Sequence, residues 1–309
     1  MTEPPSVIVE TLRGRILRGL QTGTLTKGDR LPSTRDLVAE FRVDHRIILA
    51  AYRNLAVEGL VELRRRGGIY VAAEHSAEGG MPLLPRSWIV DLFGQALARE
   101  IPVPELSEWL RRSTETLRLS AAVIAATIDQ AQGICRELRD DFGLDAEAVL
   151  ISDLSSAGTF PLPIRRADVL LSTEAHAHST RKIGDELKKP VITVEIRPDV
   201  IIGEWALLLR QPVYAIVATD AFGKMLRSFF SNVPGADNLQ VLVLGKDDLS
   251  TIPDNAPTYV TQGARAQLGT VRVPGRILPA ARTISTATAR QLLDFIVRSN
   301  IEAMRSQHR

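Results

Sequence analysis

The chain has 309 residues, a formal net charge of +2, and a composition that is 45% hydrophobic and 24% charged. This length exceeds the roughly 100–200 residues of one domain and predicts two or three folded parts, while so small a net charge does not by itself indicate a nucleic-acid partner. There is no run of about 18 apolar residues, the start MTEPPSVIVE lacks the pattern of a signal peptide, and the single Cys135 excludes internal disulfides; we therefore expect a cytoplasmic protein with no membrane partner.

Three helices are predicted in the first 60 residues. Apolar residues recur every four positions between Ile8 and Leu20 and predict a helix over about residues 6–20. Ser33 with Asp36 three positions later has the pattern of a capping box, which begins a second helix that ends near Phe41. Asp44 is placed to cap a third helix, which Gly59 ends.

A short basic hairpin follows the third helix. Residues 60–63 and 69–72 are β-type runs, and the segment RRRGG at residues 64–68 joins them. Two capped helices followed by a glycine-tipped hairpin are typical of a winged helix-turn-helix, an α+β fold. We expect residues 1–75 to form this domain and to bind double-stranded operator DNA.

The same segments resemble the GntR family of bacterial transcription regulators. The matching elements are LPSTR at residues 31–35, AYRNLAVEGLVE at residues 51–62 and RGGIYV at residues 66–71. The resemblance implies that Arg35 and the start of the third helix meet the major groove and nearby phosphates, and that the wing glycines approach the minor groove. The residues expected at DNA are Ser33, Thr34, Arg35, Asp44, His45, Arg46, Arg53, Arg64, Arg65, Arg66, Gly67 and Gly68.

One departure from the family pattern bears on base preference. Where the family usually has an arginine early in the recognition helix, this chain has His45, with Arg46 beside it. For the wing arginines, a solvated turn is the alternative to DNA contact.

Residues 76–116 are predicted to be a linker followed by a pair of helices. The segment EHSAEGGMPLLP at residues 74–85 has no periodic apolar face, whereas residues 87–99 and 104–116 are amphipathic. Trp88 and Trp109 on these helices indicate either a dimer contact or packing onto the next domain. Regulators of this type bind paired half-sites, so a homodimer is expected.

Residues 117–309 are predicted to be an α/β domain with parallel sheets. Continuous apolar runs alternate with helical segments, which favours strands covered on both faces. The expected strands are residues 121–125, 148–152, 169–172, 191–196, 213–217, 240–244 and 258–260. Their grouping resembles the bilobed periplasmic-binding-protein fold, with a second lobe at residues 212–275; a single doubly wound domain is the alternative.

The candidate effector site lies where these strands end, because parallel sheets bind ligands at the carboxyl ends of their strands. Hydroxyl groups, helix N-termini and an arginine at these ends favour a small, anionic effector. The residues are Ser152, Ser172, Thr173, His176, Arg197 and Thr219. For the serines and threonines, simple helix capping is the alternative, and Arg197 is also placed to pair with Asp199.

No cofactor, metal or catalytic residue is predicted. His176 and His178 are two positions apart and point in different directions on a helix, and the chain has no Walker loop, GxSxG, HExxH or GxGxxG motif. The sequence therefore favours a dimeric DNA-binding regulator that responds to a small molecule. The alternatives are an α/β domain that serves only for assembly and a fused metabolic enzyme.

Overall fold

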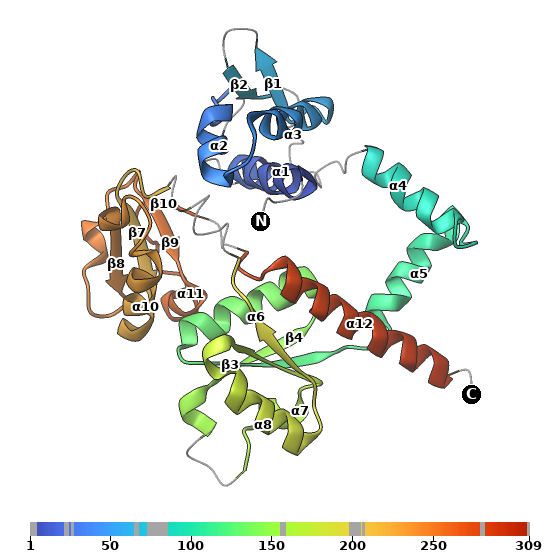
Figure 1. The fold of residues 1–309 in the computed structure, drawn as a ribbon. Helices are drawn as coiled ribbons and strands as arrows, with labels where there is room; N and C mark the ends of the chain where they lie inside the picture. The colour runs from blue at the N-terminus through green and yellow to red at the C-terminus, as the bar shows by residue number, and fades with distance from the viewer. Residues whose placement is uncertain are drawn as a thin grey trace. The chain divides into compact units, whose positions relative to one another are not determined.

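A computed structural model describes residues 5–21, 25, 28–64, 68–72, 86–154, 159–197, 205, 208–278 and 282–307. The chain divides into two compact units, Met1–Pro104 and Glu105–Arg309 (Figure 1). The division into three domains at residues 75 and 116 stays a prediction.

The first unit opens with three helices and a two-stranded antiparallel hairpin. The helices are α1 (Pro5–Gln21), α2 (Thr34–Phe41) and α3 (His45–Val57), and the hairpin is β1 (Val61–Arg64) with β2 (Gly68–Val71). The apolar faces of the helices and the hairpin meet in one core: Leu12, Ile48 and Leu55 are buried in the same cluster as Val61 and Val71 of the hairpin. The predicted winged helix-turn-helix fold is confirmed.

A short extended segment before α2 lengthens the hairpin sheet. Leu31 N donates to Ile69 O at 2.8 Å, and Val71 N donates to Asp29 O at 2.9 Å. The segment that leads into α2 is therefore fixed to strand β2 of the wing.

Two further helices follow, α4 (Arg86–Leu97) and α5 (Val103–Glu115), which match the predicted helical pair within two residues. Large apolar side chains on both stay exposed, with Trp88 at 51% and Trp109 at 52% of their surface. Their amphipathic pattern is thus only partly used for packing in this chain.

The second unit contains two four-stranded parallel sheets, as predicted for an α/β fold. The first sheet has the order β4-β3-β5-β6 and the second β10-β9-β7-β8, and every paired strand in both is parallel. The first sheet consists of β3 (Ser120–Ala125), β4 (Asp145–Leu150), β5 (Val169–Thr173) and β6 (Val191–Val194), and the second of β7 (Val213–Val217), β8 (Leu239–Val243), β9 (Pro257–Val260) and β10 (Arg276–Ile277). If the strands of each sheet are numbered along the chain, both sheets have the order 2-1-3-4.

Helices cover both faces of the first sheet. Leu138 of α6 (Ile128–Phe142) and Phe295 of α12 (Thr286–Gln307) share a buried cluster with Val169 and Leu171 of β5. Ile164 of α7 (Leu162–Arg166) and the helix α8 (Ala177–Leu187) cover the other face. The last helix thus returns to the first sheet.

The second sheet is covered in the same way. Phe230 of α10 (Asp220–Phe230) packs with Trp205 on one face, and Ala264 of α11 (Gln262–Leu268) packs with Ile216 on the other. The centroids of the Trp205 and Phe230 rings lie 4.7 Å apart. The apolar runs on strands β7 and β8 are therefore buried on both faces.

The part of the chain that the structure describes contains neither a membrane-spanning helix nor a cluster of metal ligands. Among the described helices, none is long and apolar enough to cross a membrane. Within the same residues, no three His, Cys, Asp or Glu side chains are grouped as a metal site would require.

Candidate DNA-binding interface

The start of α2 is fixed by the predicted capping box. Ser33 Oγ accepts a hydrogen bond from Asp36 N at 3.3 Å, and Ser33 N donates to Asp36 Oδ2 at 2.9 Å. Arg42 ends the helix with a left-handed φ of 53°, which turns the chain toward α3. The helix N-terminus and its free N–H groups are thus held in a defined place.

The start of α3, the predicted recognition helix, has its own cap. Asp44 Oδ1 accepts from Arg46 N at 2.7 Å. The two helix starts also touch, because Thr34 Oγ1 and His45 Nε2 share a hydrogen bond of 3.0 Å between exposed side chains. His45 is therefore oriented by the first residue of α2.

Two arginines of this unit have their charge balanced by acidic residues of the same fold. Arg13 and Arg15 of α1 are mostly buried and form ion pairs with Glu58 and Glu40. Arg13 binds Glu58 through both guanidinium and carboxylate arms, with an Nε–Oε2 distance of 2.8 Å. Their charge is neutralised within the fold.

Arg35, Arg46 and Arg53 are different. All three are exposed, and within the described part of the chain none of them forms an ion pair. Arg46 and Arg53 lie seven residues apart on α3 and so share one face of it. Their guanidinium groups are available to phosphates or to guanine edges.

The wing presents a more restrained arginine. Arg64 lies over the Tyr70 ring, 4.3 Å from its centroid, and pairs with Glu62 at 2.9 Å. The hydrogen bond between them lowers the pKa of Glu62 and raises that of Arg64. The rest of the predicted wing tip, Arg65, Arg66 and Gly67, lies outside the described residues.

Gly68 is required where it stands. Its φ is +110°, and a Cβ atom there would lie 3.1 Å from Arg30 Nε. A side chain would meet both backbone strain and the guanidinium of Arg30. The glycine thus lets Arg30 lie against the base of the wing.

Tyr52 joins the recognition helix to the segment before α2. Its side chain is 1% exposed, and its hydroxyl donates to Pro32 O at 2.8 Å. Burial raises the pKa of the Tyr52 phenol, which therefore keeps its proton at neutral pH. The helix that carries Arg46 and Arg53 is thereby tied to the one that carries Arg35.

In the second unit, five of the predicted effector residues lie at the ends of strands of the first sheet or shortly after them. Ser152 lies exposed in a 3-10 turn (Ile151–Leu154) because strand β4 ends at Leu150, two residues earlier than predicted. Arg197 follows β6, and its backbone N donates to Thr283 O at 2.8 Å. Since β4 and β6 are opposite edges of the sheet, the structure does not bring Ser152 and Arg197 together.

Ser172 and Thr173 are the last two residues of β5, and His176 lies in the short turn that follows it. Ser172 is fully buried, and its hydroxyl has no partner among the described residues. Thr173 is 9% exposed, and His176 is half-buried and accepts a hydrogen bond from Thr180 through its carbonyl. Little of this segment is open to a ligand here.

The sixth residue, Thr219, belongs to the second sheet. It caps α10 and donates through its hydroxyl to Asp129 Oδ2 at 2.9 Å. Asp129 itself was not predicted, although it stands where the first strand gives way to a helix. That strand end is the place in the sequence where it could have been found.

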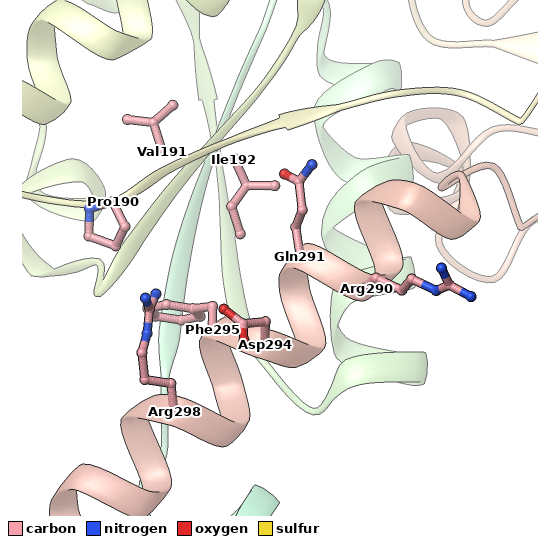
Figure 2. A pocket seen from close by; sticks show the side chains of 8 residues that line it. All are labelled: Pro190, Val191, Ile192, Arg290, Gln291, Asp294, Phe295 and Arg298. Carbon is pink, nitrogen blue, oxygen red and sulfur yellow. The ribbon is translucent and has the colours of Figure 1, made fainter.

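A pocket of about 390 Å3 lies between β6 and α12 (Figure 2). Pro190, Val191 and Ile192 line it from the strand side, and Phe295 lines it from the helix. The charged residues around it are Arg290, Asp294 and Arg298. None of the predicted effector residues lines this pocket.

Comparison with known proteins identifies the first unit. Residues 8–71 match the family model "Bacterial regulatory proteins, gntR family". Residues 8–71 form a GntR-family helix-turn-helix domain. The match covers about a fifth of the chain and includes every DNA-contact residue expected from the sequence.

Two curated relatives of the GntR domain are transcription regulators. "HTH-type transcriptional regulator Rv1152" of Mycobacterium tuberculosis is 28% identical over 82 residues, which are 26% of this chain and 68% of the relative. "Vitamin B6 salvage pathway transcriptional repressor PtsJ" of Salmonella typhimurium is 31% identical over 115 residues, which are 36% of this chain and only 25% of the relative.

Solved structures of GntR proteins are also similar over part of the chain. YtrA from Sulfolobus acidocaldarius, a GntR-family transcription factor, has a TM-score of 0.22 and 24% identity, with 34% of this chain and 84% of YtrA covered. A GntR-family transcriptional regulator from Listeria monocytogenes has a TM-score of 0.25 and 21% identity, with 36% and 96% covered.

These findings support a DNA-binding GntR-type transcription regulator rather than an enzyme. Two features of the GntR domain went unpredicted. One is the Thr34–His45 hydrogen bond, which depends on how the two helices pack. The other is Arg30, which stands directly before the LPSTR segment and lies against Gly68 of the wing.

Proposed function

We propose that this chain is a homodimeric transcription regulator whose operator binding responds to a small, anionic effector held in the α/β unit. The observation that carries the DNA part is the contrast between the paired arginines of α1 and the unpaired Arg35, Arg46 and Arg53. The fold neutralises Arg13 and Arg15 and leaves these three arginines exposed on the two helices, which supports their role at DNA.

The two capped helix starts supply the second part of the interface. Free N–H groups at a helix N-terminus bind phosphate, and a guanidinium can donate two hydrogen bonds to a guanine. Ser33, Thr34, Asp44 and His45 would then set the position of the recognition helix, while Arg64 and the wing tip would approach the neighbouring groove.

Exposed apolar side chains on α4 and α5 support dimerisation. They include Trp88, Val90, Phe93, Leu97, Trp109 and Leu110. Large apolar side chains exposed on a helix commonly mark protein–protein contacts. A dimer would place two GntR domains on two half-sites one helical turn apart.

The proposed effector site uses the carboxyl ends of the parallel strands, with Thr173 and Thr219 among its hydroxyl groups and Arg197 as a candidate cation. For regulation, the effector must bind one arrangement of the dimer more tightly than another, since an effector with equal affinity for both does not change their populations.

The DNA part is tested by selecting duplexes from a random pool with the full-length protein and measuring affinity by fluorescence anisotropy. A regulator predicts a recurrent paired half-site that binds at least about 1,000-fold tighter than scrambled DNA. Equal affinity for both duplexes would contradict it.

The dimer part is tested by sedimentation equilibrium. The double change Trp88→Asp and Trp109→Asp should give monomers, whereas Leu162→Asp, at an equally exposed leucine of α7, should not. A double variant that stays dimeric would exclude α4 and α5 as the contact.

The effector part is tested by thermal-shift screening of carboxylates and phosphates against the full-length protein. Replacing Thr173 by Val or Arg197 by Ala should remove the response of operator binding to a compound found in this way. A response retained in both variants would place the effector elsewhere.

A further inference from the structure

Asp129 is a buried carboxylate that joins the two sheets of the second unit. It lies in the first turn of α6, directly after β3 of the first sheet, and is 2% exposed. Its oxygens accept hydrogen bonds from Ala218 N at 2.8 Å, Thr219 N at 3.1 Å and Thr219 Oγ1 at 2.9 Å, and a further one from Thr261 Oγ1. The donors are 89 to 132 residues away in the sequence.

All four donors belong to the second sheet. Ala218 and Thr219 follow β7, and Thr261 follows the neighbouring strand β9. The carboxylate from the first sheet therefore sits at the carboxyl ends of two adjacent parallel strands, where α/β sheets bind their ligands. Within the described ranges, no basic side chain is among its hydrogen-bond partners.

The two hydroxyl donors are pre-oriented. Thr219 Oγ1 accepts from Phe222 N at 3.3 Å and Thr261 Oγ1 accepts from Ala264 N at 3.2 Å, since each threonine caps the helix that follows it. With the oxygen lone pairs turned to the helix, each hydroxyl proton is left to point at the carboxylate. Four fixed donors that converge on one anion are what a buried carboxylate requires.

The backbone beside these donors is shaped to the carboxylate. A Cβ atom on Gly263 would lie 2.9 Å from Asp129 Oδ1 and 3.1 Å from Asp129 Cα. Any larger residue at this position of α11 would push the carboxyl group away. The second sheet thus offers a closely fitting receptor with a carboxylate already bound in it.

We propose that these four donors form a carboxylate-binding site, that Asp129 occupies it as an internal ligand, and that a small molecule bearing a carboxylate takes its place when the two sheets move apart. Because Asp129 and the small molecule exclude each other, binding of the latter would favour the separated arrangement. The regulatory role of this exchange rests on the proposed function, whereas the existence of the carboxylate-binding site does not depend on it.

The receptor can be tested by chemical rescue in the full-length protein. Asp129→Ala removes the carboxylate and keeps all four donors, so the variant should melt at a lower temperature and sodium formate should raise that temperature. At ten times its dissociation constant, formate should raise it by about 3–5 °C relative to sodium chloride of equal ionic strength. Trp205, which is buried against the second sheet, reports the transition by its fluorescence.

Three proteins serve as controls. The wild type should show no formate effect, because Asp129 fills the site. Gly133→Ala on the same helix, where a Cβ atom would meet nothing within 4 Å, should behave as the wild type. Adding Thr219→Val to Asp129→Ala should abolish the rescue.

Equal formate effects in Asp129→Ala and in the wild type, or none in either, would overturn the proposal. If Asp129→Ala does not yield folded protein, Asp129→Ser is judged by the same criterion. Adding Gly263→Ala to Asp129→Ala would place a Cβ atom against the position of Asp129 Oδ1 and should weaken the rescue; an undiminished rescue would count against the site. No DNA is used, so a failure here is distinct from a failure of operator binding.

Discussion

Replacing Tyr52 by Phe tests how the two helices of the GntR domain are held together. The change keeps the buried ring and removes the hydroxyl that donates to Pro32 O at 2.8 Å. A hydrogen bond of this kind contributes about 0.5–1.5 kcal/mol, and an acceptor left without its partner costs about 1–3 kcal/mol. Since Pro32 is half-buried and water can replace part of the loss, we expect a cost of about 1–1.5 kcal/mol.

For a domain of 60–100 residues, a loss of this size lowers the melting temperature by about 4–12 °C. Circular dichroism of the full-length protein should show the shift in the transition of the GntR domain alone. Tyr214→Phe is the matched control, because Tyr214 of β7 donates no side-chain hydrogen bond among the described residues. A Tyr52→Phe variant that melts within 1 °C of the wild type, a margin of about 0.2 kcal/mol, would refute the reasoning.

Three further predictions concern the same domain. Thr34→Val frees the His45 ring and should weaken binding to the selected operator by roughly 2–10-fold while leaving scrambled DNA unaffected, as anisotropy would show; an equal loss on both would contradict a role in orientation. Glu62→Gln releases Arg64 for phosphate and should steepen the plot of log affinity against log salt by up to about 0.9; an unchanged slope would mean that Arg64 stays off the DNA. Because burial raises the pKa of Tyr52 above its ordinary value of 10, unfolding above pH 10 releases a proton and the wild type loses stability there, which Tyr52→Phe cannot do. The difference in melting temperature between the two should therefore narrow as the pH rises above 10, and a constant difference would contradict the burial argument.

Local signals in the sequence were sufficient for most of the elements. The capping pairs at Ser33 and Asp44 fixed where α2 and α3 begin, because a cap acts within three residues of the helix start. The apolar runs likewise placed seven of the eight strands of the two parallel sheets within three residues, because central strands such as β3, β5 and β7 are buried on both faces and are almost entirely apolar. Short elements such as α7, α11 and β10 were missed because they span too few residues for a period to show.

Contacts between distant residues could not be predicted. Asp129 meets Thr261 across 132 residues of sequence, and nothing local to either residue indicates the other. Ser152 and Arg197 were expected in one site, but the order of strands in a sheet decides which carboxyl ends are neighbours, and the sequence does not give that order. In the structure β4 and β6 are the two opposite edge strands of one sheet.

The most direct test of the account is the salt dependence and selectivity of operator binding in single arginine variants. Arg35→Ala should weaken binding to the selected operator by about 1–3 kcal/mol. Arg46→Ala and Arg53→Ala should also weaken it, and each phosphate contact that is lost should reduce the slope of log affinity against log salt by about 0.9. Arg136→Ala, which removes an arginine already paired with Asp140 on α6, should change neither quantity. If all four variants bind the operator as the wild type does, the unpaired arginines of the GntR domain are not its DNA contacts.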